Sequence, residues 1–389
     1  MNIDCFEAAG QRIMEDFIVF TDYLDNEQTK LSPKSHKLGK NDCFILNQRL
    51  KCVPELLEKP GRMQANYAEI DFFYYVCIRM GLYCVCRDGK NFVLRAQKRK
   101  LKFLQLSAAD CYGLLLAAAV GEYLPVREKY RISQYFLAGF INNNKGLKVG
   151  EEIDKDENGW GDEAYYQAYL RIFQLFDIIW IKWAVNEDGR SYVDRLYAEE
   201  CGIFIARNRL LKGQLDFWID NGNNTDVCRY LNDFKSCLKS SPDMLMDFFK
   251  TEAVQYSGSY ILKLNHGRCM RKLRIDGGDT LESLHNLIQS AVGFDDDHLY
   301  YFETGNDPYT EKYYCPDCNE HTRSTSEVTL NELGLVEGVI FHYLFDFGDE
   351  WLFELYVDKI IPERTLNGEI IEAKGKAPEQ YPVYDEDWY

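Results

Sequence analysis

The chain has 389 residues, of which 46% are hydrophobic and 28% charged, and its formal net charge is −17. This composition is typical of a globular protein and excludes a disordered or collagen-like chain, and the length predicts two or three domains. No segment reaches the roughly 18 consecutive apolar residues that a membrane span needs, and residues 1–11 lack the basic stretch of a signal peptide. Thirteen cysteines without regular spacing are typical of reduced thiols, so we expect a cytoplasmic protein that contacts no membrane.

The first predicted domain, residues 1–125, is helical and ends in a β-hairpin. Apolar residues near helical spacing predict helices over residues 1–24, 42–50 and 67–80, the last ending at Gly81 because glycine accepts a positive φ. Residues 82–86 and 91–94 predict two strands around the turn pair Asp88-Gly89. Ser107 is a suitable N-cap for the next apolar helix. A helix that leads into a hairpin is similar to the end of a winged-helix module.

The hairpin region carries the densest basic stretch of the chain. Its cations form the candidate DNA contact: Arg87, Lys90, Arg95, Lys98, Arg99, Lys100 and Lys102. Binding to nucleic acid depends largely on neutralising phosphates with such side chains. The alternative is a solvated hairpin face that binds nothing.

The second predicted domain, residues 126–250, repeats the pattern without the basic residues. Residues 165–179 predict a helix, and residues 180–185 and 191–197 predict two strands around Asp188-Gly189. Residues 226–250 are predicted to be helical and to connect to the last domain. Winged-helix modules bind DNA or dock proteins, so DNA and an unknown protein partner both remain open.

The last predicted domain, residues 256–389, carries nearly all the negative charge. Residues 251–389 contain 11 basic and 27 acidic residues, whereas residues 1–250 contain 34 and 35. Predicted strands at 260–264 and 271–275 are followed by a helix between the N-cap Thr280 and Gly293. Further strands are predicted at 298–302, 339–345 and 351–357, after a long loop in residues 303–329. This order is that of a β-grasp (ubiquitin-like) fold, so the whole chain is expected to be of the α+β class.

Several short motifs follow one another in this domain. They are YILK at 260–263, TL at 280–281, LH at 284–285, IQ at 288–289, GF at 293–294, HL at 298–299, LGL at 333–335, FDFGDEW at 345–351 and KGKAPEQYP at 374–382. In this order they resemble the plasmid pRiA4b ORF-3-like family over about residues 256–388. The resemblance implies a β-grasp fold and an association with plasmids and transposons. It implies no general enzymatic activity, and we therefore expect a non-enzymatic interaction protein.

The alternative function is a metal-dependent enzyme. Its candidate catalytic residues are Asp346, Asp349, His285 and His298, because carboxylate oxygens suit divalent cations. The other interpretation is that the aspartates bond the backbone of a β-turn and the histidines pack the helix against the sheet. The chain also departs from the family, with MRK at 270–272 for the usual WRR and Phe353 for the usual histidine. No phosphate-binding loop, HExxH or GxSxG motif is present.

The long loop contains a CxxC pair followed by a histidine. Cys315, Cys318 and His321 have the spacing of part of a zinc site, so zinc is the one candidate cofactor. Zinc needs a fourth ligand, for which His285, His298 and His342 are candidates. The alternatives are thiols without a ligand and a redox pair, although redox CxxC pairs usually begin a helix.

Overall fold

The computed structural model describes residues 4–27, 29–52, 59–123, 139–154, 164–187, 191–211, 227–250, 258–306, 309–318 and 323–381. The chain divides into two compact units. Unit 1 comprises Met1–Ser32, Lys37–Tyr83 and Ala96–Lys250, and unit 2 comprises Pro33–His36, Cys84–Arg95 and Thr251–Tyr389. The division of residues 1–250 into two domains stays a prediction.

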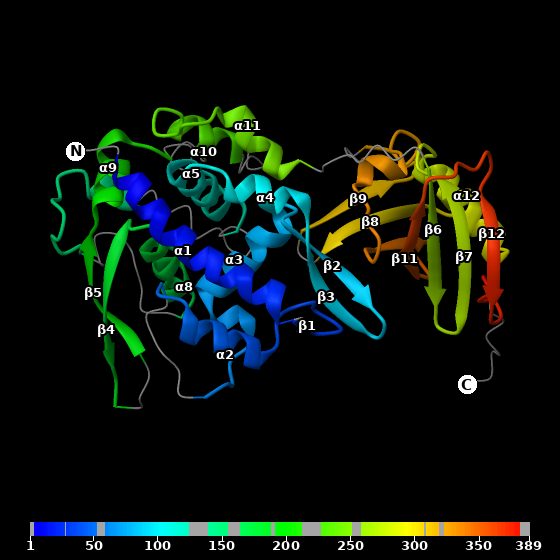
Figure 1. Cartoon of the computed structure of the whole chain (residues 1–389), viewed down its shortest axis with the longest axis horizontal. Helices are drawn as coiled ribbons and strands as arrows, with labels where there is room; N and C mark the ends of the chain where they lie inside the picture. The colour runs from blue at the N-terminus through cyan, green and yellow to red at the C-terminus, as the bar shows by residue number, and fades with distance from the viewer. Residues whose placement is uncertain are drawn as a thin grey trace, which may run out of the picture. The chain divides into compact units, whose positions relative to one another are not determined.

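Unit 1 is mainly helical (Figure 1). Its elements are α1 (Asp4–Asn26), β1 (Lys30–Leu31), α2 (Lys40–Arg49), η1 (Gln64–Asn66), α3 (Ala68–Arg79), α4 (Lys98–Leu104), α5 (Ala108–Ala118), η2 (Ala119–Tyr123), α8 (Ala164–Leu175), β4 (Ile179–Val185), β5 (Ser191–Ala198), α9 (Glu200–Asn208), α10 (Val227–Phe234), α11 (Pro242–Met246) and η5 (Asp247–Phe249).

A side chain at Gly10 would lie 2.0 Å from the carbonyl oxygen of Ala108, so the glycine lets α1 approach the start of α5. The predicted N-cap is present, since Ser107 accepts a bond from the backbone N–H of Asp110. Strands β4 and β5 form a separate antiparallel pair.

The first predicted hairpin is also present, but the basic stretch is not all part of it. Strands β2 (Tyr83–Asp88) and β3 (Asn91–Ala96) are neighbours, and Gly81 has the expected positive φ of 61°. Residues from Lys98 onward form α4 instead of continuing the hairpin face. The reason is packing: Lys100 and Phe103, three residues apart, are both buried. Lys98, Arg99, Lys100 and Lys102 are therefore helical residues of unit 1.

Unit 2 is built on a seven-stranded sheet. Its elements are β6 (Ser259–His266), β7 (Cys269–Asp276), α12 (Leu281–Val292), β8 (Tyr300–Asn306), β9 (Tyr309–Tyr314), η6 (Leu330–Leu333), β10 (Ile340–Phe345), β11 (Trp351–Ile361) and β12 (Glu369–Lys374). The strand order is β12-β7-β6-β11-β10-β8-β9, and every neighbouring pair is antiparallel. Helix α12 covers one face, where its apolar side chains join those of the strands in one core. The chain is thus of mixed helix and sheet, as predicted.

Two strands of this sheet were not predicted. Strand β9 lies in the segment predicted to be a long loop, and β12 follows the last predicted strand. Strand β12 has no apolar alternation, since Ile370 and Ile371 are adjacent and both exposed, and the backbone ladder with β7 holds it in place. The helix limits were predicted correctly, because Thr280 caps α12 and Gly293 has a φ of 75°.

Replacing Thr280 by alanine is expected to reduce the free energy of unfolding by about 1 kcal/mol. The hydroxyl of Thr280 accepts a hydrogen bond from the backbone N–H of Ser283 at 3.2 Å, and alanine leaves that donor without its cap. Urea denaturation measures the difference. Ser290→Ala, in the same helix and exposed, is the matched control and should be nearly neutral.

Within the described ranges, no single helix is long and apolar enough to cross a membrane. Helix α4 and the continuous α5–η2 segment pass that test as a pair, by length and composition alone, with a bend of 118° between them.

Candidate functional site

His285 of α12 lies at the centre of a buried polar chain. Its ring is 1% exposed and stacks on Tyr300 with ring centroids 3.7 Å apart. The Nδ1 atom lies 2.7 Å from the hydroxyl of Tyr343 on β10, and the Nε2 atom lies 2.9 Å from a carboxylate oxygen of Asp296. His285 therefore joins the helix to the sheet, as the packing interpretation predicted.

The hydrogen bonds define which atoms of this chain carry protons. The hydroxyl of Tyr343 accepts a bond from Nε2 of Gln289 at 2.7 Å, so its own hydrogen is directed at Nδ1 of His285. Nε2 of His285 then carries the ring hydrogen and donates it to Asp296. Burial lowers the pKa of His285, and the carboxylate of Asp296 only partly opposes this effect. The imidazole is thus neutral, and it acts as a connector between donors and acceptors.

This neutral histidine predicts a dependence of stability on pH. Because the folded-state pKa lies below the unfolded value of about 6.5, the unfolded chain binds more protons as the pH falls through that value. The free energy of unfolding should therefore fall between pH 7 and 5.5, with a slope of at most about 1.4 kcal/mol per pH unit from this residue. Urea denaturation at several pH values measures the slope, which should be smaller in His285→Gln. A ring proton of His285 that titrates at or above its ordinary pKa in an NMR experiment would contradict the assignment.

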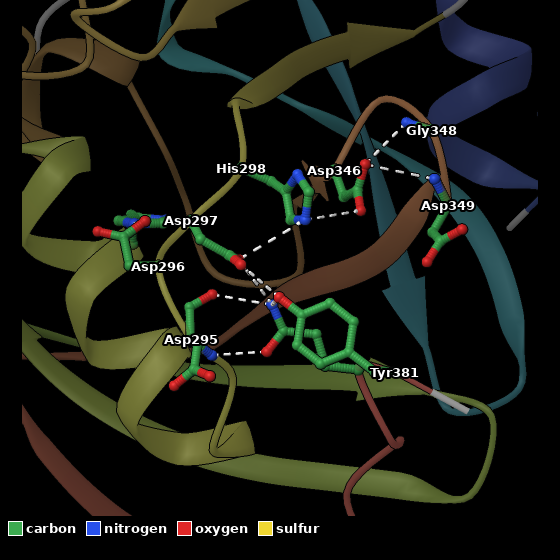
Figure 2. A network of polar contacts seen from close by, with 10 residues as sticks. Asp295, Asp296, Asp297, His298, Asp346, Gly348, Asp349 and Tyr381 are labelled. Atoms are coloured by element: carbon green, nitrogen blue, oxygen red, sulfur yellow. Dashed lines mark hydrogen bonds and ion pairs between the residues drawn. The ribbon is translucent and has the colours of Figure 1, made fainter. Parts of the chain in front are cut away.

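A second polar cluster surrounds Asp346 at the turn between β10 and β11 (Figure 2). One carboxylate oxygen of Asp346 accepts bonds from the backbone N–H groups of Gly348 at 2.8 Å and Asp349 at 3.4 Å. The other oxygen lies 3.5 Å from Nε2 of His298, and a carboxylate oxygen of Asp297 lies 3.6 Å from the same nitrogen. Asp346 has a φ of 58°, which its local bonds to the turn stabilise. These contacts fit the predicted turn interpretation.

The end of the described chain closes over this cluster. Tyr381 donates a hydrogen bond to Asp297, and Gln380 bonds the backbone of Asp295 in both directions. The hydrogen bond to Asp297 raises the pKa of Tyr381 to about 12 and lowers that of Asp297. Tyr381 therefore stays protonated at neutral pH and holds residues 295–297 in place.

The predicted metal-binding residues are not gathered in one site. His285 pairs with Asp296, whereas His298 lies beside Asp297 and Asp346. In the part of the chain that the structure describes, no group of three or more histidine, cysteine or acidic side chains has an arrangement that holds a metal ion. The sulfur atoms of Cys315 and Cys318 are 2.7 Å apart, and His321 lies outside the described residues. The zinc site and the metal-dependent enzyme stay predictions.

The seven predicted DNA contacts have different surroundings. Lys100 is buried and binds Asp25 at 2.5 Å, and Arg99 donates to the backbone oxygens of Met80 and Lys250. Arg87 binds Glu354 at 2.5 Å, and Arg95 donates to the carbonyl of Glu337. Lys90, Arg95, Lys98 and Lys102 are exposed. The charged groups of Arg87, Arg99 and Lys100 thus bind other groups of the protein. Lys100 is buried, and the two arginines are only partly exposed.

The sheet face opposite α12, which we call the open face, was not identified from the sequence. Strand register aligns Leu352, Leu344, Tyr301 and Tyr314 in one row across β11, β10, β8 and β9, with Phe347 beside Tyr301. Leu352 and Phe347 are 49% and 44% exposed.

A polar row runs alongside the apolar row of the open face. It contains Glu354, His342, Glu303 and Lys312, each two residues from its apolar neighbour on the same strand. Alternation along each strand is the signal that places both rows on one face. The order of the strands, which puts the four positions in line, is not visible in the sequence.

The comparisons with known proteins concern this same unit. Residues 261–380 match the family model of the plasmid pRiA4b ORF-3-like protein. The predicted resemblance is confirmed for the C-terminal third, and this pRiA4b ORF-3-like segment contains both polar clusters and the open face. No curated protein matches the chain. Among solved structures, it is similar to the protein of unknown function MM3350 from Methanosarcina mazei Go1, with 23% identity, a TM-score of 0.29, and coverage of 32% of this chain and 73% of that chain.

Proposed function

We propose that the protein is a non-enzymatic interaction protein whose open face docks a cationic segment of a partner protein. The observation that carries the proposal is the ion pair between Arg87 and Glu354 inside unit 2. Arg87 lies 267 residues before Glu354, so a cation from a distant segment of the chain already binds a carboxylate of the polar row. The backbone N–H of Arg87 also donates to the carbonyl of Gly338 at 2.9 Å.

The chemistry of the open face suits such a ligand. The ammonium of Lys312 lies 4.4 Å from the ring centre of Tyr301, and that of Lys263 lies 5.6 Å from the ring centre of Tyr356. Aromatic rings attract cations through their electron-rich faces. Glu303 and Glu354 stand beside the apolar row and are paired with Lys312 and Arg87. A segment with alternating cationic and aliphatic side chains would satisfy both rows by replacing these cations.

The overall charge supports a cationic partner. Residues 251–389 hold 27 acidic and 11 basic residues, and such a field speeds the approach of a positively charged protein. The same field repels DNA, so nucleic-acid binding would depend on the exposed cations Lys90, Arg95, Lys98 and Lys102. DNA binding through this region is the second candidate function, which the docking proposal excludes. The association with mobile elements stays a prediction.

Two finer features of the fold also belong to the proposal. The passage of α3 into the β2–β3 hairpin supports a winged-helix-like arrangement. The β6–β7 hairpin packed under α12 supports a β-grasp arrangement. Strand β10 runs in the same direction as β6, but β11 lies between them and is antiparallel to both, so the two strands do not form a hydrogen-bonded parallel pair.

Binding of a labelled peptide of alternating lysine and leucine to the full chain tests the proposal by fluorescence anisotropy. We expect binding at low salt that weakens at moderate salt, because part of the attraction is electrostatic. A peptide of alternating glutamate and leucine is the control and should not bind. No binding of the cationic peptide, or equal binding of both peptides, would overturn the proposal.

A further inference from the structure

Cys315 and Cys318 occupy the first and fourth positions of a turn at the end of β9. The backbone N–H of Cys318 donates to the carbonyl of Cys315 at 3.1 Å, and the N–H of Cys315 continues the sheet by donating to Tyr300. A β-turn closed by this bond holds its first and fourth Cα atoms within about 7 Å, which is compatible with a disulfide. Pro316 fixes φ at the second turn position and so keeps the two cysteines close before any reaction.

The two thiols are in contact but differ in access to solvent. Their sulfur atoms lie 2.7 Å apart. Cys315 is 4% exposed and belongs to the core of unit 2, whereas Cys318 is partly exposed and packs against that core. A reagent in solution can therefore reach Cys318, and Cys315 needs only to reach its neighbour.

We propose that Cys315 and Cys318 are a dithiol modification site that reacts with a low-molecular-weight disulfide and closes into an intramolecular disulfide. The thiolate of Cys318 attacks one sulfur of the small disulfide, forms a mixed disulfide and expels one small thiolate. The thiolate of Cys315 then attacks the sulfur of Cys318 and expels the second small thiolate. The two protons of the cysteines pass through water to the two leaving thiolates. One dithiol is oxidised as one small disulfide is reduced.

This site differs from the redox pair of an oxidoreductase. No helix begins at Cys315, since the described residues 316–318 form a turn directly after β9, so no helix dipole from that turn is directed at the thiols. In this proposal the small disulfide oxidises the pair, and an excess of small thiol reduces it again. It needs no catalytic activity and does not depend on the docking function proposed above.

Mass spectrometry of the full chain after equilibration with glutathione and glutathione disulfide tests the proposal, with a chelator present so that no bound metal masks the thiols. Denaturing alkylation stops the exchange before digestion with trypsin. Cleavage after Lys312 and Arg323 yields one peptide with Cys315 and Cys318 and no other cysteine. We expect this peptide to lose both alkylation sites and two hydrogen atoms as the disulfide fraction rises, and to regain both sites in excess glutathione.

The single variants give opposite results if Cys318 reacts first. In Cys315→Ser, a glutathione adduct should accumulate on Cys318, because no second thiol expels it. In Cys318→Ser, the buried Cys315 should remain alkylated without an adduct. Equal adducts in both variants, or a wild-type peptide alkylated twice under every condition, would overturn the proposal.

The chain also contains a matched comparison pair. Cys84 and Cys86 lie two positions apart on β2, with sulfur atoms 3.3 Å apart, and trypsin isolates them between Arg79 and Arg87. The strand holds them along its axis and forms no turn between them, so this peptide should stay doubly alkylated where residues 315 and 318 have closed. Closure of both pairs to the same extent at every glutathione ratio would show unselective oxidation and overturn the proposal.

Discussion

Replacing His285 by alanine is expected to lower the free energy of unfolding by about 3 kcal/mol, the largest single-residue effect in unit 2 that we predict. The substitution removes a fully buried ring and its stacking on Tyr300. It also leaves the hydroxyl of Tyr343 without its acceptor in the core, and unsatisfied buried groups are costly. Urea denaturation followed by tryptophan fluorescence measures the loss.

Two further variants show whether the polar chain acts as a unit. His298→Ala, at a histidine that is 39% exposed, is the matched control and should cost less than about 1 kcal/mol. Tyr343→Phe removes the other end of the hydrogen bond, so its effect and that of His285→Ala should not add in the double variant. Fully additive losses would contradict a direct bond between the two side chains.

Reversing the charge of Glu303 and Glu354 together is expected to weaken binding of the cationic peptide about thirtyfold at low salt, or by about 2 kcal/mol. Both carboxylates lie in the polar row of the open face, one on each side of His342 in strand register. Two lysines there turn attraction into repulsion. Fluorescence anisotropy with the lysine–leucine peptide measures the change.

The control is a second double variant that makes the same change in net charge at other positions. Glu363→Lys combined with Glu379→Lys alters two exposed glutamates that lie outside the rows of the open face. Binding should then fall by much less than thirtyfold, because only the long-range field changes. Equal losses in the two double variants would mean that net charge alone attracts the peptide, and the open face would not be the docking surface.

Local chemistry explains why much of the fold was predictable. Thr280 and Gly293 define the limits of α12 through capping and a positive φ, and Asp88-Gly89 defines the β2–β3 turn; both signals depend on neighbouring residues only. Strand β12 gives no such signal, because it is an exposed edge strand held by backbone bonds to β7. The helix α4 was missed because its cations obscured the inward side formed by Lys100 and Phe103.

The candidate sites depended more on contacts between distant residues. Lys100 was predicted to be a surface contact, but its partner Asp25 lies 75 residues earlier, and no sequence pattern links the two. The histidines at 285 and 298 were identified as a pair from the family motifs, yet each lies against a different aspartate. The open face requires the order β11-β10-β8-β9, which the chain order of the strands does not reveal.

The most direct test of the docking proposal is the effect of Arg87→Ala in the full chain on two ligands, the lysine–leucine peptide and duplex DNA, each at low and moderate salt. Arg87 occupies Glu354 within unit 2, so its removal frees a carboxylate for the peptide. Our account predicts that the peptide binds more tightly to the variant and that DNA binds neither protein. Salt-sensitive DNA binding that Arg87→Ala weakens, together with unchanged or weaker peptide binding, would contradict it and place the function in the basic hairpin.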